Sequence, residues 1–321
     1  MSPIQQSRNV FPLCTCISMR TIRILFIILT LILAVTMIRY GKRIYSFNID
    51  LIARVSMKDR EDLSMTNWTM AQALGFIKRF GEQIRTRDPV NGTSDNFCSI
   101  QLLGIAKTKE LWAAHALCDY RDIIRTKNSC LFYSFGIANK YDFDLELANK
   151  WKCQGVAFDP NIAHKSKLHP KITFHMIGAR TLSDDIDRQW QLVSTVPQLQ
   201  SCFGHTSIDI LKMDCEGCEY ALARDIEQYN INFFETISQF TVEIHVSKRW
   251  IQTPQHLINF GKLLYFLEKA NLHLIHTIMS GCSSDHEALG CPQELLDVNY
   301  PCEIGKMCQN FLFAKDMSKS I

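Results

Sequence analysis

The residues best suited to do chemistry lie in one short stretch, residues 206–220, with the sequence TSIDILKMDCEGCEY. An apolar run from Ile208 to Met213 leads directly into two acids, Asp214 and Glu216. This pattern predicts a buried strand that ends in an acidic turn and opens a helix. Carboxylates at the carboxyl end of such a strand face the crevice where open α/β sheets bind ligands. Capping of the following helix would explain the same acids.

A second stretch, residues 130–160, supplies elements that must lie beside this strand. Its sequence, CLFYSFGIANKYDFDLELANKWKCQGVAFDP, predicts a strand, a glycine-containing loop, a helix and a second strand that ends in Asp159. Such a βαβ unit of about 30 residues, with an acid about 20 residues after the glycine loop, has the layout of a mononucleotide half-site. Gly136 would let the backbone approach a ligand, and Asp159 would accept hydrogen bonds from ribose hydroxyls.

Four motifs in this order, SFGIA, VAFDP, DILKMDCEGCE and FTVEIH, resemble those of the S-adenosylmethionine-dependent methyltransferases of the FkbM and methyltransferase-like protein 24 type. The resemblance covers about residues 130–315. It implies a Rossmann-like class I methyltransferase fold, with a seven-stranded and mostly parallel sheet, and S-adenosylmethionine as the cofactor. One departure concerns the first loop, where Gly136 stands alone before Ala138 and Asn139, whereas the family usually has two or three glycines there.

The resemblance also implies which residues hold the cofactor. The first loop would wrap its methionine part, Asp142 and Asp144 would reach its ammonium, and Ile177 and Gly178 would flank the adenine. Helix capping explains Asp142 and Asp144 equally well. The full set that we predict is Ser134, Phe135, Gly136, Ile137, Asp142, Asp159, Ile177, Gly178 and Asp214.

The catalytic candidates stand at the ends of two predicted strands. Methyl transfer needs a positioned acceptor and a group that removes its proton. His245 is the best general-base candidate because an imidazole titrates near neutral pH. His175 lies inside an apolar strand, so we expect it to be a core residue. The predicted catalytic set is Asp214, Glu216, Glu243 and His245.

Two further interpretations of the same turn stay open. Its acids, together with Glu219 and His245, could bind a divalent cation. The resemblance does not require one, and we predict no metal. Cys215 and Cys218 form CEGC, a spacing typical of a redox or zinc pair. No second well-spaced pair accompanies it, so we expect buried thiols or disulfides elsewhere.

The remaining segments predict the rest of the sheet and its helices. Alternating strands and helices of this length indicate a mostly parallel sheet with helices on both faces. A helical extension over 67–118 would precede the methyltransferase domain over 119–321. The predicted strands are 131–135, 155–158, 172–177, 208–213, 240–244, 272–279 and 310–314, and the predicted helices are about 142–152, 183–199, 217–229 and 254–270.

The N-terminal part predicts a membrane anchor. Residues 22–38 are almost wholly apolar and, at about 1.5 Å per helical residue, are long enough to reach across most of a bilayer. Basic residues follow, without a small-x-small cleavage site, so we predict an uncleaved anchor rather than a signal peptide. The anchor would join a cytoplasmic tail (1–21) to a stem (39–66).

Two signals orient this predicted anchor. Asn67 and Asn91 begin N-glycosylation triplets, which are used only in a lumenal domain. Eleven of the 13 cysteines follow the anchor, a density that suits an oxidising compartment. Their odd number leaves at least one free or intermolecular. We therefore predict a single-pass type II protein whose C-terminal domain lies in the Golgi, in the endoplasmic reticulum or outside the cell.

Charge limits the class of partner. Residues 1–60 hold nine of the 35 basic residues but two of the 32 acids, so the rest of the chain is mildly acidic and no nucleic-acid partner is predicted. The acceptor would be a small molecule, a glycan or a lipid, methylated on oxygen. One alternative is a non-catalytic lumenal binding protein on the same fold. Another is a type II glycosyltransferase whose D-x-D motif would be Asp142 to Asp144.

Overall fold

The computed structural model describes residues 68–86, 98–104, 114–119, 130–162, 167–180, 193–280, 282 and 284–315, all within one compact unit that spans residues 60–321. The predicted tail, anchor (22–38) and stem, together with Asn67 and Asn91, lie outside these residues. None of the described helices is both long and apolar enough to cross a membrane. The anchor and the glycosylation sites therefore stay predictions.

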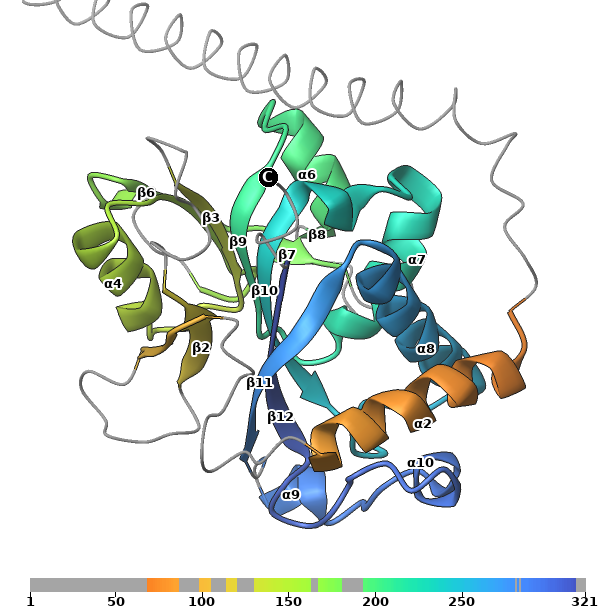
Figure 1. Cartoon of the computed structure of the whole chain (residues 1–321). Helices are drawn as coiled ribbons and strands as arrows, with labels where there is room; N and C mark the ends of the chain where they lie inside the picture. Colours follow the sequence, from red (N-terminus) through yellow and green to blue (C-terminus); the bar gives the residue numbers. More distant parts are fainter. Residues whose placement is uncertain are drawn as a thin grey trace, which may run out of the picture. The chain divides into compact units, whose positions relative to one another are not determined.

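An eight-stranded sheet forms the centre of the described unit (Figure 1). Its strand order is β11-β12-β10-β9-β3-β4-β6-β5. The neighbours from β10 to β6 in this order run parallel, whereas β12 is antiparallel to both β10 and β11. The bounds are β3 (Leu131–Phe135), β4 (Gln154–Phe158), β5 (Lys167–His169), β6 (Ile172–His175), β9 (Ile208–Met213), β10 (Ile237–His245), β11 (Leu272–Ser280) and β12 (Cys308–Lys315).

This mostly parallel sheet confirms the predicted Rossmann-like fold. Without β5, and counted along the chain, the strand order is 6-7-5-4-1-2-3. All six residues of β9 are buried, as expected for a central strand that is covered on both faces, and four of them are apolar. The edge strand β5 was not predicted, because its segment is polar and is followed at once by Pro170.

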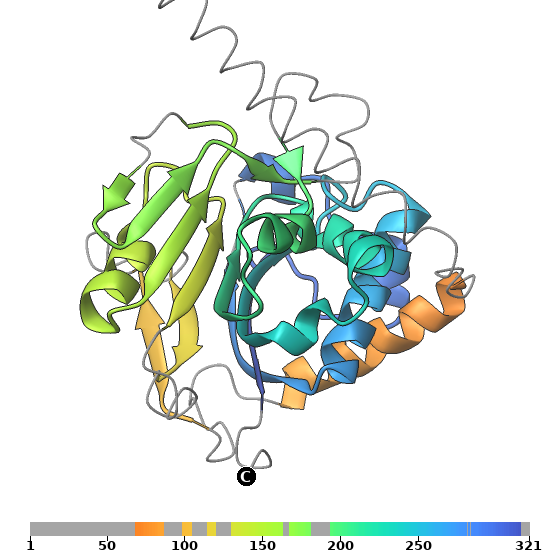
Figure 2. The ribbon, with the colours of Figure 1, turned by 90° about the horizontal axis from the view of Figure 1, so that it is seen from above.

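Helices cover one face of the sheet (Figure 2): α2 (Met70–Thr86), α6 (Val196–Cys202), α7 (Cys218–Tyr229) and α8 (Pro254–Lys269). Helix α2 packs closely on α8, where a Cβ atom added to Gly261 would lie 2.5 Å from the Cα of Ala73. The ring of Phe80 in α2 lies 5.0 Å from that of Phe311 and 5.8 Å from that of Phe313. The first half of the predicted helical extension is thus a helix that belongs to the core.

The opposite face carries α4 (Asp142–Lys150) and an antiparallel pair of strands, β1 (Ile100–Leu103) and β2 (His115–Cys118). Over these two described strands, the helix predicted for the second half of the extension is wrong. All four residues of β2 are buried, and the Cys98–Cys118 disulfide ties the pair together. The Gln239 side chain on β10 forms two hydrogen bonds with the Cys118 backbone, at 2.8 and 3.2 Å. Tertiary packing therefore decides the conformation of a run too short to identify by its period.

The helix predicted over 183–199 is confirmed for residues 196–199 and is wrong for residues 193–195. Residues 193–194 form strand β8 (Val193–Ser194), which pairs with β7 (Gly178–Ala179). Helix α6 begins only after Thr195, whose side chain accepts a hydrogen bond from the Gln198 N–H, and Pro197 occupies its first turn. A capping threonine followed by a proline favours a helix start at this point. Residues 181–192 lie outside the described residues.

Ten of the eleven cysteines that follow the predicted anchor form disulfides, and Cys202 is free and exposed. This confirms that an odd number leaves one unpaired. Cys215 and Cys218 are joined to each other, which corrects the expectation that they would not pair, because the turn between β9 and α7 brings them together. The disulfides are Cys98–Cys118, Cys130–Cys153, Cys215–Cys218, Cys282–Cys308 and Cys291–Cys302.

Candidate active site

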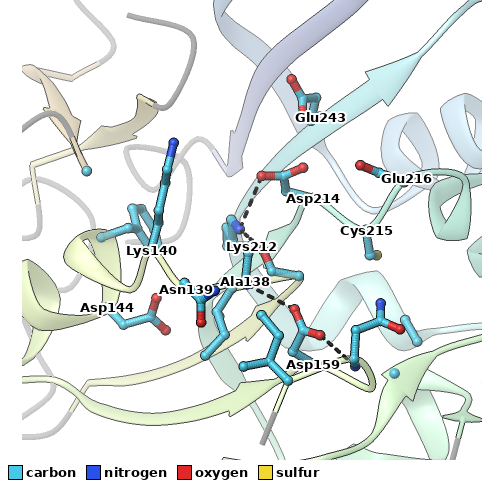
Figure 3. A pocket seen from close by; sticks show the side chains of 18 of the residues that line it. Ala138, Asn139, Lys140, Asp144, Asp159, Lys212, Asp214, Cys215, Glu216 and Glu243 are labelled. Atoms are coloured by element: carbon cyan, nitrogen blue, oxygen red, sulfur yellow. Dashed lines mark hydrogen bonds and ion pairs between the residues drawn. The ribbon is translucent and has the colours of Figure 1, made fainter. Parts of the chain in front are cut away.

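A cavity of about 650 Å³ opens at the carboxyl ends of β3, β4, β9 and β10 (Figure 3). This is the volume expected of a small-molecule site. In the view of Figure 3, Asp144 and Asp159 lie toward one end of the cavity, and Asp214, Glu216 and Glu243 toward the other. The predicted site residues that line it are Gly136, Ile137, Asp142, Asp159, Gly178, Asp214, Glu216 and Glu243, whereas Ser134, Phe135, Ile177 and His245 do not line it.

Gly136 closes the cavity floor by bringing two strand ends together. Its φ of 71° favours glycine, and an added Cβ atom would lie 1.7 Å from the carbonyl oxygen of Asp214. The Gly136 N–H donates to the carbonyl oxygen of Phe158 at 3.0 Å. We predicted from the sequence that Gly136 lets the backbone approach a ligand. The structure adds a second requirement, the close approach of the β9 turn.

Asp159 follows β4 and organises the cavity wall with both carboxylate oxygens. Oδ2 accepts from the Ala138 N–H and Oδ1 accepts from the Asn161 N–H, each at 2.9 Å. The residue is 5% exposed and lines the cavity. A carboxylate oxygen can accept more than one hydrogen bond, so these contacts leave acceptor capacity toward a ligand.

Asp144, in the first turn of α4, is buried without a full set of hydrogen-bond partners. It is 1% exposed, lines the cavity, and its Oδ1 has no hydrogen-bond partner among the described residues. Burial raises its pKa to about 6, against the opposing effects of Lys212 and Ser134. A buried carboxylate of this kind is stabilised by a cationic group.

Lys212, a lysine within the apolar strand β9, was missing from the predicted site. Its Nζ donates to the carbonyl oxygens of Phe135 at 3.3 Å and Gly136 at 3.0 Å, and to Asp214 Oδ2 at 3.5 Å. Burial raises the pKa of Asp214, but Lys212, together with the nearby His115 and Glu243, outweighs it and holds that pKa well below its usual value. The signal for Lys212 was present as a charged residue in a predicted buried strand, which calls for a partner.

Glu243, at the end of β10, has the opposite protonation state. Burial and the nearby Asp214 carboxylate raise its pKa to about 8. The Asn310 Nδ2 donates to its Oε1 at 3.4 Å, and its Oε2 lies 3.5 Å from the Nε2 of His245. A carboxyl group beside an ionised carboxylate loses its own proton less readily. Glu243 therefore holds a proton at neutral pH while Asp214 is ionised.

His245 points into the protein rather than into the cavity. It is 3% exposed, and Glu219 Oε1 lies 3.1 Å from both its Nδ1 and its backbone N. Burial lowers its pKa, but Glu219 and Glu243 outweigh this and raise the pKa well above its usual value. A histidine that is already charged does not accept another proton, so the geometry argues against the predicted general-base role.

His115 is the histidine that does line the cavity, and sequence reasoning missed it. Its Nε2 lies 3.7 Å from Asp214 Oδ2, and its Nδ1 lies 3.5 Å from the Thr241 hydroxyl. Burial lowers its pKa. The sequence carried no signal for this position, because β2 lies about 100 residues before Asp214 and its pattern is ambiguous.

The acids do not form a metal site with the predicted partners. Glu219 Oε2 accepts from the Gly217 N–H at 2.9 Å, so both its oxygens serve the turn and His245. Among the described residues, Glu243, His245 and Cys308 place one ligand atom each within 4.8 Å of the others. Cys308 is bonded to Cys282, however, which removes its sulfur as a thiolate ligand.

The strand order and a cavity at the carboxyl ends of the strands are those of a Rossmann-like ligand-binding enzyme. Residues 91–277 match the family described as a methyltransferase domain, which is more than half of the chain, so the protein belongs to that family. It is also 27% identical over 164 residues to the "Probable methyltransferase-like protein 24" of Rattus norvegicus. The predicted resemblance is confirmed, and with it S-adenosylmethionine as the cofactor.

The matches are partial. The match to the rat protein covers 48% of this chain and 44% of that protein. A fibrillarin pre-rRNA processing protein of Methanococcus jannaschii is similar over 59% of this chain and 68% of its own, with 12% identity and a TM-score of 0.29. A SAM dependent methyltransferase from Archaeoglobus fulgidus is similar over 59% and 87%, with 11% identity and a TM-score of 0.29. The assignment therefore rests on the family match and the observed strand order.

Proposed function

We propose that this protein is a membrane-anchored S-adenosylmethionine-dependent methyltransferase that methylates an oxygen atom of a secretory-pathway acceptor. The observation that carries the proposal is the pair of buried carboxylates, Asp144 and Asp159, on the wall of one cavity. Asp159 would accept hydrogen bonds from the ribose hydroxyls. The unpartnered oxygen of Asp144 suits the ammonium of a methionine group. The residues present thus fit the cofactor at two separate points.

The remaining cavity residues fit the acceptor side of the reaction. When bound, S-adenosylmethionine supplies an electrophilic methyl group. Asp214, Glu216 and Glu243 lie at the other end of the cavity from Asp159 in the view of Figure 3, where an acceptor would enter. Glu243 is protonated and can donate a hydrogen bond, and the ionised Asp214 can accept one. Together they would orient a neutral group that both donates and accepts, as a hydroxyl does.

Photochemical labelling tests where the cofactor binds. The full-length protein is irradiated with methyl-tritiated S-adenosylmethionine, and the labelled peptides are sequenced. We expect label within residues 130–162 or 206–220, suppressed by S-adenosylhomocysteine and lost in Asp159→Ala. The matched control is Asp297→Ala, at an exposed residue of α10 (Gln293–Asp297). Label that is absent, or unaffected by S-adenosylhomocysteine, would contradict the proposal.

The membrane part of the proposal rests on sequence and on the disulfides. Residues 22–38 supply the anchor, Asn67 and Asn91 supply the glycosylation signals, and five disulfides suit an oxidising compartment. We expect the expressed protein to resist alkaline extraction from membranes and to lose mass on treatment with an N-glycosidase. Asn67→Gln with Asn91→Gln should abolish the mass loss. A protein recovered in the soluble fraction without glycan would contradict this part of the proposal.

The glycosyltransferase alternative is disfavoured by the position of its D-x-D motif. Such a motif needs carboxylates that reach a shared metal ion. Asp144 is 1% exposed in the first turn of α4, and its pKa of about 6 reflects burial without a full set of partners. A single buried carboxylate beside a glycine-containing loop fits a cationic ligand group better than a hydrated metal.

A further inference from the structure

His115 is held in place by contacts that lie outside the methyltransferase motifs. Its strand β2 is tied by the Cys98–Cys118 disulfide and by the Gln239 hydrogen bonds to the Cys118 backbone. The ring of Phe143, from α4, packs against the imidazole with 5.4 Å between the ring centres. The imidazole is therefore fixed on the cavity wall from three elements, β1, β10 and α4.

The two ring nitrogens of His115 face different groups. Nδ1 lies 3.5 Å from the hydroxyl of Thr241, which is 1% exposed. If Nδ1 carries the proton, Nδ1–H donates a hydrogen bond to the Thr241 oxygen, and Nε2 keeps a lone pair. Nε2 lies 3.7 Å from Asp214 Oδ2, too far for a direct hydrogen bond. A hydroxyl group in the cavity can lie within hydrogen-bond reach of both atoms.

The charged groups around His115 favour this arrangement. The facing groups are Asp214 and Lys212 on β9 and its turn. Glu243 on β10 lines the same cavity and interacts with Asp214. Lys212 donates to two carbonyl oxygens and to Asp214, so its charge is already partnered. Burial lowers the pKa of His115, Glu243 holds a proton at neutral pH, and the pKa of Asp214 is too low for a base. His115 is then the facing group that is unprotonated at neutral pH and keeps a lone pair on a ring nitrogen.

We propose that His115 is the general base of this site and takes the proton of the methyl acceptor on Nε2, with Asp214 stabilising the imidazolium that forms. The proposal rests on the methyltransferase function proposed above. The acceptor O–H proton passes to Nε2, and the O–H bonding pair stays on oxygen. That oxygen forms the bond to the methyl carbon, and the carbon–sulfur pair remains on sulfur. The positive charge that starts on the sulfonium ends on the imidazolium, opposite the Asp214 carboxylate.

Nitrogen NMR of the imidazoles gives a test that needs no acceptor. The full-length protein, labelled with ¹⁵N-histidine and saturated with S-adenosylhomocysteine, is measured at pH 7, and His115→Gln identifies the His115 signals. We expect a neutral ring with its proton on Nδ1, and a shift of the proton toward Nε2 in Thr241→Val. A charged ring, or a proton on Nε2 in the wild type, would overturn the proposal. Failure to bind S-adenosylhomocysteine at all would count against the proposed function instead.

Matched acceptors separate a base from a structural residue. Formation of S-adenosylhomocysteine is measured with phenol, which must lose a proton, and with benzoate, which has already lost it. We expect His115→Gln to lower the rate with phenol by about 100- to 10,000-fold, to spare that with benzoate, and to leave S-adenosylmethionine affinity within about twofold. The control is His273→Gln, at an exposed position of β11. An equal loss of rate with both probes, or no loss with either, would overturn the proposal. If the wild type methylates neither probe, the NMR result alone decides.

Discussion

Two histidines near the cavity are equally buried and differ in charge. His115 is 4% exposed and His245 is 3% exposed. The Nδ1 of His245 lies 3.1 Å from Glu219 and its Nε2 lies 3.5 Å from Glu243, and these two groups raise its pKa above the usual value despite burial. His115 faces one carboxylate, Asp214, which Lys212 already partners, so burial prevails and lowers its pKa. Burial alone thus does not decide the protonation state, and whether the nearby carboxylate already has a cationic partner matters as well.

The difference also separates two tasks. His245 bonds to Glu219 at the start of α7 and joins that helix to the end of β10. It is a structural cation beneath the acidic turn. His115 reaches the cavity from a strand outside the central sheet and has room for a ligand beside it. A histidine next to a sequence motif is therefore not the better base when its partners keep it charged.

The largest expected effect comes from breaking the His245 cluster. In Glu219→Gln the charged imidazole keeps its burial but loses a carboxylate, so we expect the free energy of unfolding to fall by about 3–5 kcal/mol. Denaturant unfolding at pH 7 measures it. The matched control is Glu235→Gln, at an exposed residue, with an expected change within about 0.5 kcal/mol. A similar small change in both variants would mean that His245 is not a buried cation.

A smaller effect is expected at the cofactor end of the cavity. Asp144→Asn removes the charge that would hold the donor ammonium, so we expect S-adenosylmethionine affinity to fall by about 10- to 100-fold, the loss of one charge-assisted hydrogen bond. Asp142→Asn, on the same turn but less buried, should have a weaker effect. Equilibrium dialysis compares the two. Equal losses would show that Asp144 has no special contact with the ligand.

The smallest expected effect is on the pH dependence of the free energy of unfolding. The pKa of Glu243 in the folded protein, about 8, exceeds its ordinary value of 4.5, so the folded state binds its proton more tightly. This contribution is complete below about pH 4.5 and is lost as the pH rises through 8, with a slope of up to about 1.4 kcal/mol per pH unit. His245, with its raised pKa, acts in the same direction. Glu243→Gln should flatten the slope of unfolding free energy between pH 5 and 8, and an unchanged slope would contradict the assignment.

The sequence was enough to predict the central sheet because its strands are long apolar runs with turns between them. The acid after β4 and the acids after β9 follow from the same pattern, since carboxyl ends of parallel strands meet at one edge. His115 could not be found in this way. Its strand has four residues, its position depends on the Cys98–Cys118 disulfide and on Gln239, and neither contact has a local signal.

The charge states of the buried side chains could not be predicted from the sequence either. His245 was the natural choice for a base because a free imidazole titrates near neutral pH. Its state depends on Glu219, which lies 26 residues earlier and meets it only through the packing of α7 on β10. Lys212 could have been singled out, because a lysine in an apolar strand needs acceptors, but which acceptors it has follows from the loop at Gly136.

The most direct test of the account is a calorimetric titration of S-adenosylmethionine, and then of S-adenosylhomocysteine, into the full-length protein with its disulfides intact. We expect saturable binding of one molecule per chain by the wild type and by His115→Gln. We expect loss of binding in Asp159→Ala, whose carboxylate binds two backbone N–H groups and lines the cavity. A folded wild type that binds neither ligand, or an Asp159→Ala variant that binds as tightly as the wild type, would contradict it.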